Sequence, residues 1–66
     1  MMADEKKVLR LLKTARGQMD GIIKMVEENR YCIDISQQLL ATEAILNRAN
    51  TDILAAHLKH FVQDAA

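Results

Sequence analysis

Apolar residues recur along the first third of the chain at alternating steps of three and four positions. The stripe consists of Val8, Leu12, Ala15, Met19, Ile22 and Val26, and it is widened by Leu11 and Ile23. Because an α-helix has about 3.6 residues per turn, this spacing places the whole stripe on one face. Asp4 is a suitable N-cap, and a polar run ends the pattern after Val26. The spacing therefore predicts a first helix over about residues 4–28.

The same alternation resumes after the polar segment. Its members are Cys32, Ile35, Leu39, Thr42, Leu46, Ala49, Ile53 and Ala56. Asn29 is a residue type that favours a helix C-terminus, so we expect a short turn and then a second helix over about residues 32–62. That helix would be about 45 Å long. It also carries apolar residues outside the stripe, namely Ala41, Ala44, Ile45, Leu54, Leu58 and Phe61.

This pattern predicts a single all-α domain over residues 1–66, built as a two-helix hairpin. The absence of proline and the scarcity of glycine agree with helix throughout. A two-helix hairpin cannot bury apolar surface on both faces of its second helix, and chains of this size are marginal alone. We therefore predict a homodimer that forms an antiparallel four-helix bundle, with further association into a tetramer left open.

Composition and charge narrow the function classes. Nine basic residues balance nine acidic ones, and the single cysteine excludes an internal disulfide framework. Without an apolar run of membrane length or a leader, we expect a soluble, cytoplasmic protein. Residues 1–30 have net charge +2 and residues 31–66 have net charge −2, so an anion-binding face must lie on the first helix. The cations of that face are Lys6, Arg10, Lys13, Arg16 and Lys24, interrupted by Asp20. No arrangement of nucleophile and base indicates an enzyme.

The candidate metal ligands are Cys32, His57 and His60. Cys32 and His57 are 25 positions apart, so they share a helix face but lie about 37 Å apart along it. One chain cannot bring them together, whereas an antiparallel copy of the same helix can, which predicts two equivalent sites between subunits. The alternatives are a cysteine that is merely a small buried side chain and histidines that are merely solvated at a helix C-terminus. Tyr31 either orients a ligand or packs at the turn.

Several short motifs give the chain a family resemblance. They are Gly17-Gln18-x-x-Gly21, Met25-Val26-Glu27, Tyr31-Cys32-Ile33-Asp34-Ile35, Gln38 and His57-Leu58-x-His60. With these residues the chain, over about residues 9–62, resembles the CsoR/RcnR/FrmR family of small helical bacterial repressors. Members of that family sense copper, nickel or cobalt, formaldehyde, or sulfur species. The resemblance implies hairpin dimers that usually pair into tetramers, a cysteine facing the histidine of another subunit, and release of operator DNA on ligand binding.

The resemblance assigns roles but leaves the signal open. It implies that Cys32 and His57 are ligands of Cu(I), Ni(II), Co(II) or Zn(II), or that Cys32 is a nucleophile for a small electrophile such as formaldehyde. His60 is a candidate additional ligand because it lies three positions from His57 on the same helix. Phe61 stands where copper and sulfur sensors of the family have a second cysteine. The chain also begins Met1-Met2-Ala3 and lacks the N-terminal proline of formaldehyde sensors.

The resemblance also implies contacts of Lys13, Arg16 and Arg48 with DNA phosphates. Family members typically have arginine at the positions of Thr14, Asp20 and Glu43, and two of these residues are acidic here. Fewer phosphate contacts would weaken DNA binding. The alternative function is therefore a helical scaffold or adaptor that has lost DNA binding, and a third is a protein that buffers metal or aldehyde. Many relatives also have a short third helix after the histidine region.

Overall fold

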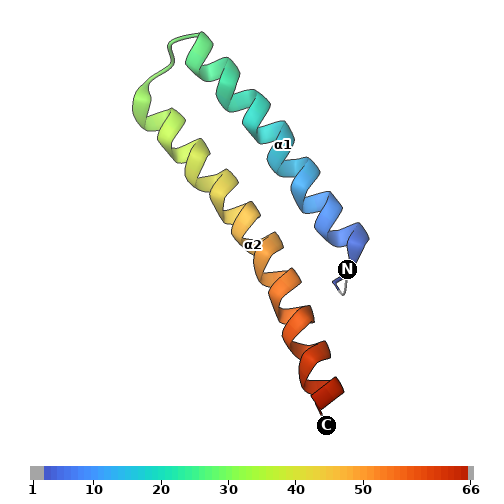
Figure 1. Ribbon diagram of the computed structural model, residues 1–66. Coiled ribbons are helices and arrows are strands. Elements are labelled where there is room, and N and C mark those ends of the chain that lie inside the picture. Colours follow the sequence, from blue (N-terminus) through green and yellow to red (C-terminus); the bar gives the residue numbers. More distant parts are fainter. Residues whose placement is uncertain (1–2, 66) are drawn as a thin grey trace.

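The computed structural model consists of two α-helices that form an antiparallel hairpin (Figure 1). It describes residues 3–65, and the side chains of residues 3–61. Helix α1 spans Glu5–Glu27 and helix α2 spans Cys32–Ala65. The predicted all-α hairpin is confirmed, α2 begins where the sequence placed it, and no third helix occurs within residues 3–65. Neither described helix has an apolar stretch long enough to cross a membrane.

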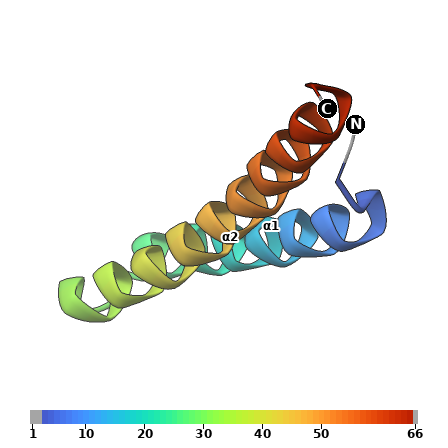
Figure 2. The ribbon, with the colours of Figure 1, turned by 90° about the horizontal axis from the view of Figure 1, so that it is seen from below.

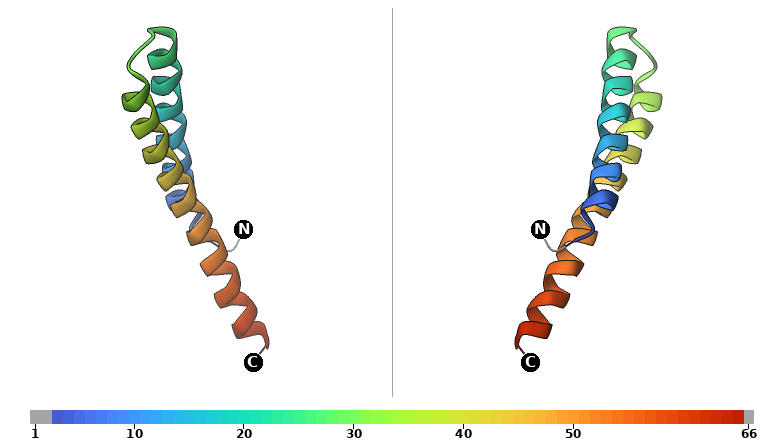
Figure 3. Two further views of the ribbon diagram at one scale, coloured as in Figure 1. Left: turned by 90° about the vertical axis from the view of Figure 1, so that its left-hand side faces the viewer. Right: turned by 90° about the vertical axis from the view of Figure 1, so that its right-hand side faces the viewer.

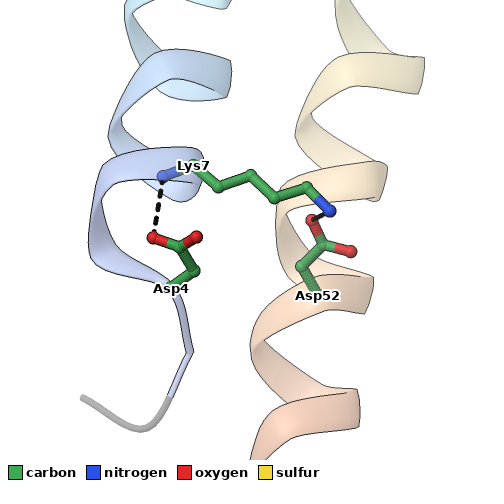
Figure 4. Close-up of polar contacts among 3 residues, drawn as sticks. All are labelled: Asp4, Lys7 and Asp52. Carbon is green, nitrogen blue, oxygen red and sulfur yellow. Dashed lines mark hydrogen bonds and ion pairs between the residues drawn. The ribbon is translucent and has the colours of Figure 1, made fainter.

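Capping residues fix both ends of α1. The side chain of Asp4 accepts a hydrogen bond of 3.3 Å from the backbone N–H of Lys7 (Figure 4). At the other end Asn29 has a φ of 55°, the left-handed conformation that glycine and asparagine adopt most easily. The backbone N–H of Asn29 donates to the Val26 carbonyl, and that of Arg30 donates to the Met25 carbonyl. This pair of bonds is a Schellman motif, and it reverses the chain within a few residues.

Small side chains form most of the seam between the helices. Val8, Ala15 and Ile22 of α1 are buried at intervals of seven residues, and Ala49 and Thr42 are buried on α2. The Thr42 hydroxyl lies 2.9 Å from Gln18 Oε1 and 3.1 Å from the Gln38 carbonyl oxygen, and it donates its single proton between these two acceptors. Thr42 is thus a polar residue at a position that the sequence pattern placed in the apolar stripe.

An ion pair joins the helices near the start of α1. Lys7 Nζ lies 3.3 Å from Asp52 Oδ2, so the lysine side chain spans the gap between the two helices (Figure 4). Asp52 Oδ2 is shielded from solvent and accepts no well-directed hydrogen bond among the described residues. The Lys7 ammonium therefore compensates its burial, although the half-exposed lysine limits the net gain to about 1 kcal/mol or less.

Helix α2 continues well beyond the start of α1 (Figures 1 and 2). The Lys7–Asp52 pair lies at the beginning of α1, so α2 has no α1 residue opposite it from about residue 55 onward. We call residues 55–65 the overhang. The Cα atoms span 55 × 19 × 10 Å, and the hairpin is one helix thick when viewed along its edge (Figure 3).

The hairpin leaves most of its large apolar side chains in solvent. Only four apolar residues are buried, whereas thirteen large apolar residues are exposed. The exposed residues are Leu9, Leu12, Met19, Ile23, Val26, Tyr31, Ile33, Leu39, Leu40, Leu46, Leu54, Leu58 and Phe61. A monomeric soluble domain rarely exposes so much contiguous apolar surface. This apolar surface is available to a second chain, and the homodimer predicted from the sequence stays a prediction.

Asn29 offers a direct test of the turn. Replacing Asn29 with Ala should cost about 1 kcal/mol of unfolding free energy, because an alanine Cβ is strained at positive φ. Replacing it with Gly should leave the stability unchanged or slightly raised, since glycine adopts this conformation without strain. Urea denaturation followed by circular dichroism at fixed protein concentration measures both. Equal destabilisation by the two variants would show that the asparagine side chain itself, and not its backbone conformation, stabilises the turn.

Candidate functional site

Cys32 and His57 occupy opposite ends of the same helix. Cys32 is the first residue of α2 and is exposed, while His57 is exposed on the overhang. Because α2 is continuous between them, 25 positions separate them by about 37 Å along the axis. Among the described residues no three histidine, cysteine or acidic side chains lie close enough to hold a metal ion, and no pocket is present. One hairpin therefore does not bring the two candidate ligands together.

The two polar contacts between the helices identify the sides of the hairpin. Counted at about 100° per residue, Lys7 lies about 80° from Ala15 in one rotational sense, and Asp52 lies about 80° from Thr42 in the same sense. Since these two side chains meet, positions rotated in this sense lie on one side of the hairpin, which we call the Lys7 side. The Gln18–Thr42 bond agrees with this assignment, because Gln18 is rotated from Ala15 in the same sense.

Cys32 and His57 lie on the opposite side. They are rotated from Thr42 by about 80° and 60° in the other sense. We call this the Cys32 side. It also carries the exposed apolar residues Leu12, Met19 and Ile23 of α1 and Leu39, Leu46, Leu54 and Phe61 of α2. Both candidate ligands are therefore set in the apolar surface that a second chain would cover.

The remaining predicted site residues surround these two. Tyr31 precedes Cys32 at the end of the turn and is 66% exposed. Phe61 lies one turn beyond His57 on the same side and is 65% exposed. His60 is also on the overhang, rotated by about 60° from His57 toward the phase of the seam. An aromatic ring thus occupies the position from which a further donor would otherwise reach the site.

The predicted DNA-contacting cations are not gathered on one side. Lys13, Arg16 and Arg48 are all exposed, and none forms an ion pair within residues 3–61. By helical phase Arg16 lies on the Cys32 side, Arg48 lies on the Lys7 side and Lys13 lies on the back of α1. Glu43 shares the Cys32 side with Arg16, whereas Asp20 lies on the back of α1.

The ion pair between Lys7 and Asp52 could not be predicted from the sequence. The pattern gave no reason to pair Lys7 with Asp52, since they are 45 positions apart and each is flanked by other polar residues. Thr14, at a position where the resembling family has arginine, donates its hydroxyl proton to the Arg10 carbonyl oxygen at 2.9 Å within α1. It adds no charge to the surface.

Comparison with known proteins resolves the family. A family profile described as a metal-sensitive transcriptional repressor matches residues 4–66. The chain belongs to this repressor family. Its members are repressors and not enzymes, as the sequence predicted.

Curated relatives of the metal-sensitive repressor family agree. The copper-sensing transcriptional repressor CsoR of Mycobacterium ulcerans is 48% identical over 59 residues, which cover 88% of this chain and 50% of the relative. CsoR of Bacillus subtilis is 37% identical over 62 residues, or 94% of this chain and 61% of the relative. The copper-sensing repressor RicR of Mycobacterium tuberculosis is 39% identical over 54 residues, which cover 82% of this chain and 56% of the relative. The chain thus spans about half the length of these relatives. No solved structure matches it significantly.

Proposed function

We propose that this chain is a cytoplasmic, metal-responsive transcriptional repressor. It binds operator DNA as a homo-oligomer and releases it when intersubunit sites made of Cys32 and His57 are occupied. The observation that carries this proposal is the placement of both ligands on the apolar Cys32 side, at opposite ends of one continuous helix. Family membership supports the repressor function, and the copper-sensing relatives support a transition metal as the signal.

The overhang favours one dimer over its main competitor. If the twofold axis is perpendicular to the helices, α2 packs antiparallel on the α2 of its partner. With the axis midway between residues 44 and 45, Cys32 then lies level with the partner subunit's His57. The exposed Phe61 of each overhang and the exposed Leu54 just before the overhang are then covered by the turn end of the other hairpin. A twofold axis parallel to the helices would instead pack α2 on the partner's α1 and leave both overhangs uncovered.

The donor set fits a soft or borderline metal ion. A thiolate and an imidazole suit Cu(I) and Zn(II), and imidazole also suits Ni(II) and Co(II). Cys32 would hold the ion from one subunit, His57 would hold it from the other, and His60 is the remaining imidazole on the overhang. A bound ion would supply a bond between subunits that the apolar contact alone lacks. With Phe61 in place of a further donor, attack of the Cys32 thiol on an electrophile such as formaldehyde is the alternative signal.

DNA binding is the part of the proposal for which the sequence also supports an alternative function. Lys13 and Arg48 supply unpaired cations for phosphates, and an oligomer multiplies them. Arg16, the third cation that the family resemblance implied, lies on the Cys32 side. The zero net charge and the exposed acids Asp20 and Glu43 favour instead a scaffold of the same fold without DNA binding. Salt-dependent binding of the purified protein to the DNA upstream of its own gene supports the repressor. No binding at low salt supports the scaffold.

A cysteine at position 57 tests the antiparallel dimer. His57→Cys should form an intersubunit disulfide with Cys32 under mild oxidation, giving a covalent dimer on a non-reducing gel. Lys59→Cys, also exposed on the overhang but rotated by about 200° from His57, is the matched control and should remain monomeric on the gel. The wild-type chain controls for a disulfide between two Cys32 residues. Equal crosslinking of both variants would contradict this arrangement of the subunits.

Phe61 provides a test of the metal site. Phe61→Cys should raise the affinity for Cu(I) at least tenfold in competition with a colorimetric chelator, because it adds a soft donor one turn from His57. Cys32→Ala should abolish Cu(I) binding while leaving DNA binding intact, since Cys32 lies away from the cations. Retention of tight Cu(I) binding by Cys32→Ala would rule out the proposed ligand set. The response to formaldehyde, read as a mass increase on Cys32, distinguishes the alternative signal.

A further inference from the structure

Three exposed cations lie at the same level of the hairpin, and one of them, Arg10, is not among the residues that the family resemblance assigned to DNA contacts. They are Arg10 and Lys13 on α1 and Arg48 on α2. None of their charged groups forms an ion pair among the described residues. The inference drawn from them rests on the proposed DNA-binding function and assigns its contact surface.

The level of each residue follows from the two contacts between the helices. Lys7 meets Asp52 and Gln18 meets Thr42, so residues whose numbers add to 59 or 60 lie opposite each other. Arg48 therefore lies opposite residues 11–12. Arg10 and Lys13 flank this level, each within about 3 Å of it along the axis.

The side of each residue follows from helical phase. Arg10 is rotated by about 140° from Ala15, and Arg48 by about 120° from Thr42, both in the sense that leads to the Lys7 side. Lys13 lies three positions from Arg10 and so adjoins it on the back of α1. Arg16, in contrast, is rotated by about 100° toward the Cys32 side. Arg10 thus connects Lys13 to Arg48 in one cationic patch, whereas Arg16 is separate from it.

The surroundings of this patch suit a phosphate backbone. By helical phase none of the twelve exposed large apolar residues of the two helices lies on the Lys7 side, so a dimer formed through the Cys32 side leaves the patch accessible. The nearest acid on that side, Asp52, is neutralised by Lys7. Asp34, on the same side, is 14 positions from Arg48, or about 21 Å along α2.

We propose that Arg10, together with Lys13 and Arg48, forms the DNA-contacting surface of this protein, and that Arg16 lies outside it. Arg10 and Arg16 are both exposed and unpaired on α1, but only the replacement of Arg10 is expected to weaken DNA binding. The contacts are to phosphate and therefore add affinity without sequence preference.

Arg10→Gln and Arg16→Gln form the matched pair for the test. Fluorescence anisotropy would measure the affinity of each variant for the DNA upstream of its own gene over a range of salt concentrations. Arg10→Gln should lower the affinity and reduce the slope of log K against log salt by about 0.9 per subunit engaged. Arg10→Lys should retain the slope, and Arg16→Gln should leave affinity and slope unchanged. Circular dichroism and the mass of the oligomer confirm that each variant is folded and assembled.

The outcomes separate this inference from the proposed function. If the wild-type protein binds DNA and Arg10→Gln keeps the full slope, the Arg10 patch is wrong while the repressor proposal stands. A lower slope for Arg16→Gln with no change for Arg10→Gln would place the DNA on the other side of the hairpin. If the wild-type protein binds no DNA at any salt concentration, both proposals fail together.

Discussion

Two helices share a single seam, and in this chain the seam is made of small side chains. The buried apolar residues are Val8, Ala15, Ile22 and Ala49, and the burial of two alanines, a valine and an isoleucine cannot offset the entropy of ordering more than 60 residues. Thirteen large apolar residues are exposed, and most of them lie on the Cys32 side and the overhang. In the proposed homo-oligomer a second chain would cover this apolar surface, and the candidate site lies within it.

The two sides of the hairpin differ in chemistry and in the function proposed for each. The Cys32 side is apolar and holds both candidate ligands, so the proposed assembly and the proposed ligand binding would use the same surface. The Lys7 side has no exposed large apolar residue, and its cations are left unpaired by the fold except for Lys7. Residues that are neighbours in the sequence are thereby separated by function: Arg16 follows Ala15 of the seam directly, yet it lies on the side opposite to Arg48 and Arg10.

Sequence periodicity was sufficient to predict the two helices, but it did not predict which side of the hairpin each residue occupies. Steps of three and four residues identified both helices, and the residue types at Asp4 and Asn29 identified the ends of α1, because each has a local physical cause. Helical phase likewise showed that Cys32 and His57 share a face. It did not show which way that face is turned relative to α1, since this depends on the register of the hairpin. The register is fixed by the Lys7–Asp52 ion pair and the Gln18–Thr42 hydrogen bond. The partners are separated by 45 residues in the first contact and by 24 residues in the second, so no local pattern reveals them.

Of the two helices described within residues 3–65, α2 is the one that carries both proposed ligands and a cation of the proposed DNA-binding surface. Cys32 and His57 lie on one of its sides and Arg48 lies on the other, so the two surfaces are separated only by the width of the helix. A ligand weakens DNA binding only if it binds more tightly to an arrangement that fits DNA less well. In this hairpin the position of Arg48 relative to Arg10 is set by how α2 is rotated against α1. The contacts that hold this rotation are the Thr42 hydroxyl with Gln18 and the Lys7–Asp52 pair, one partly buried hydrogen bond and one half-exposed ion pair. Each of these two contacts contributes only about 1 kcal/mol to stability.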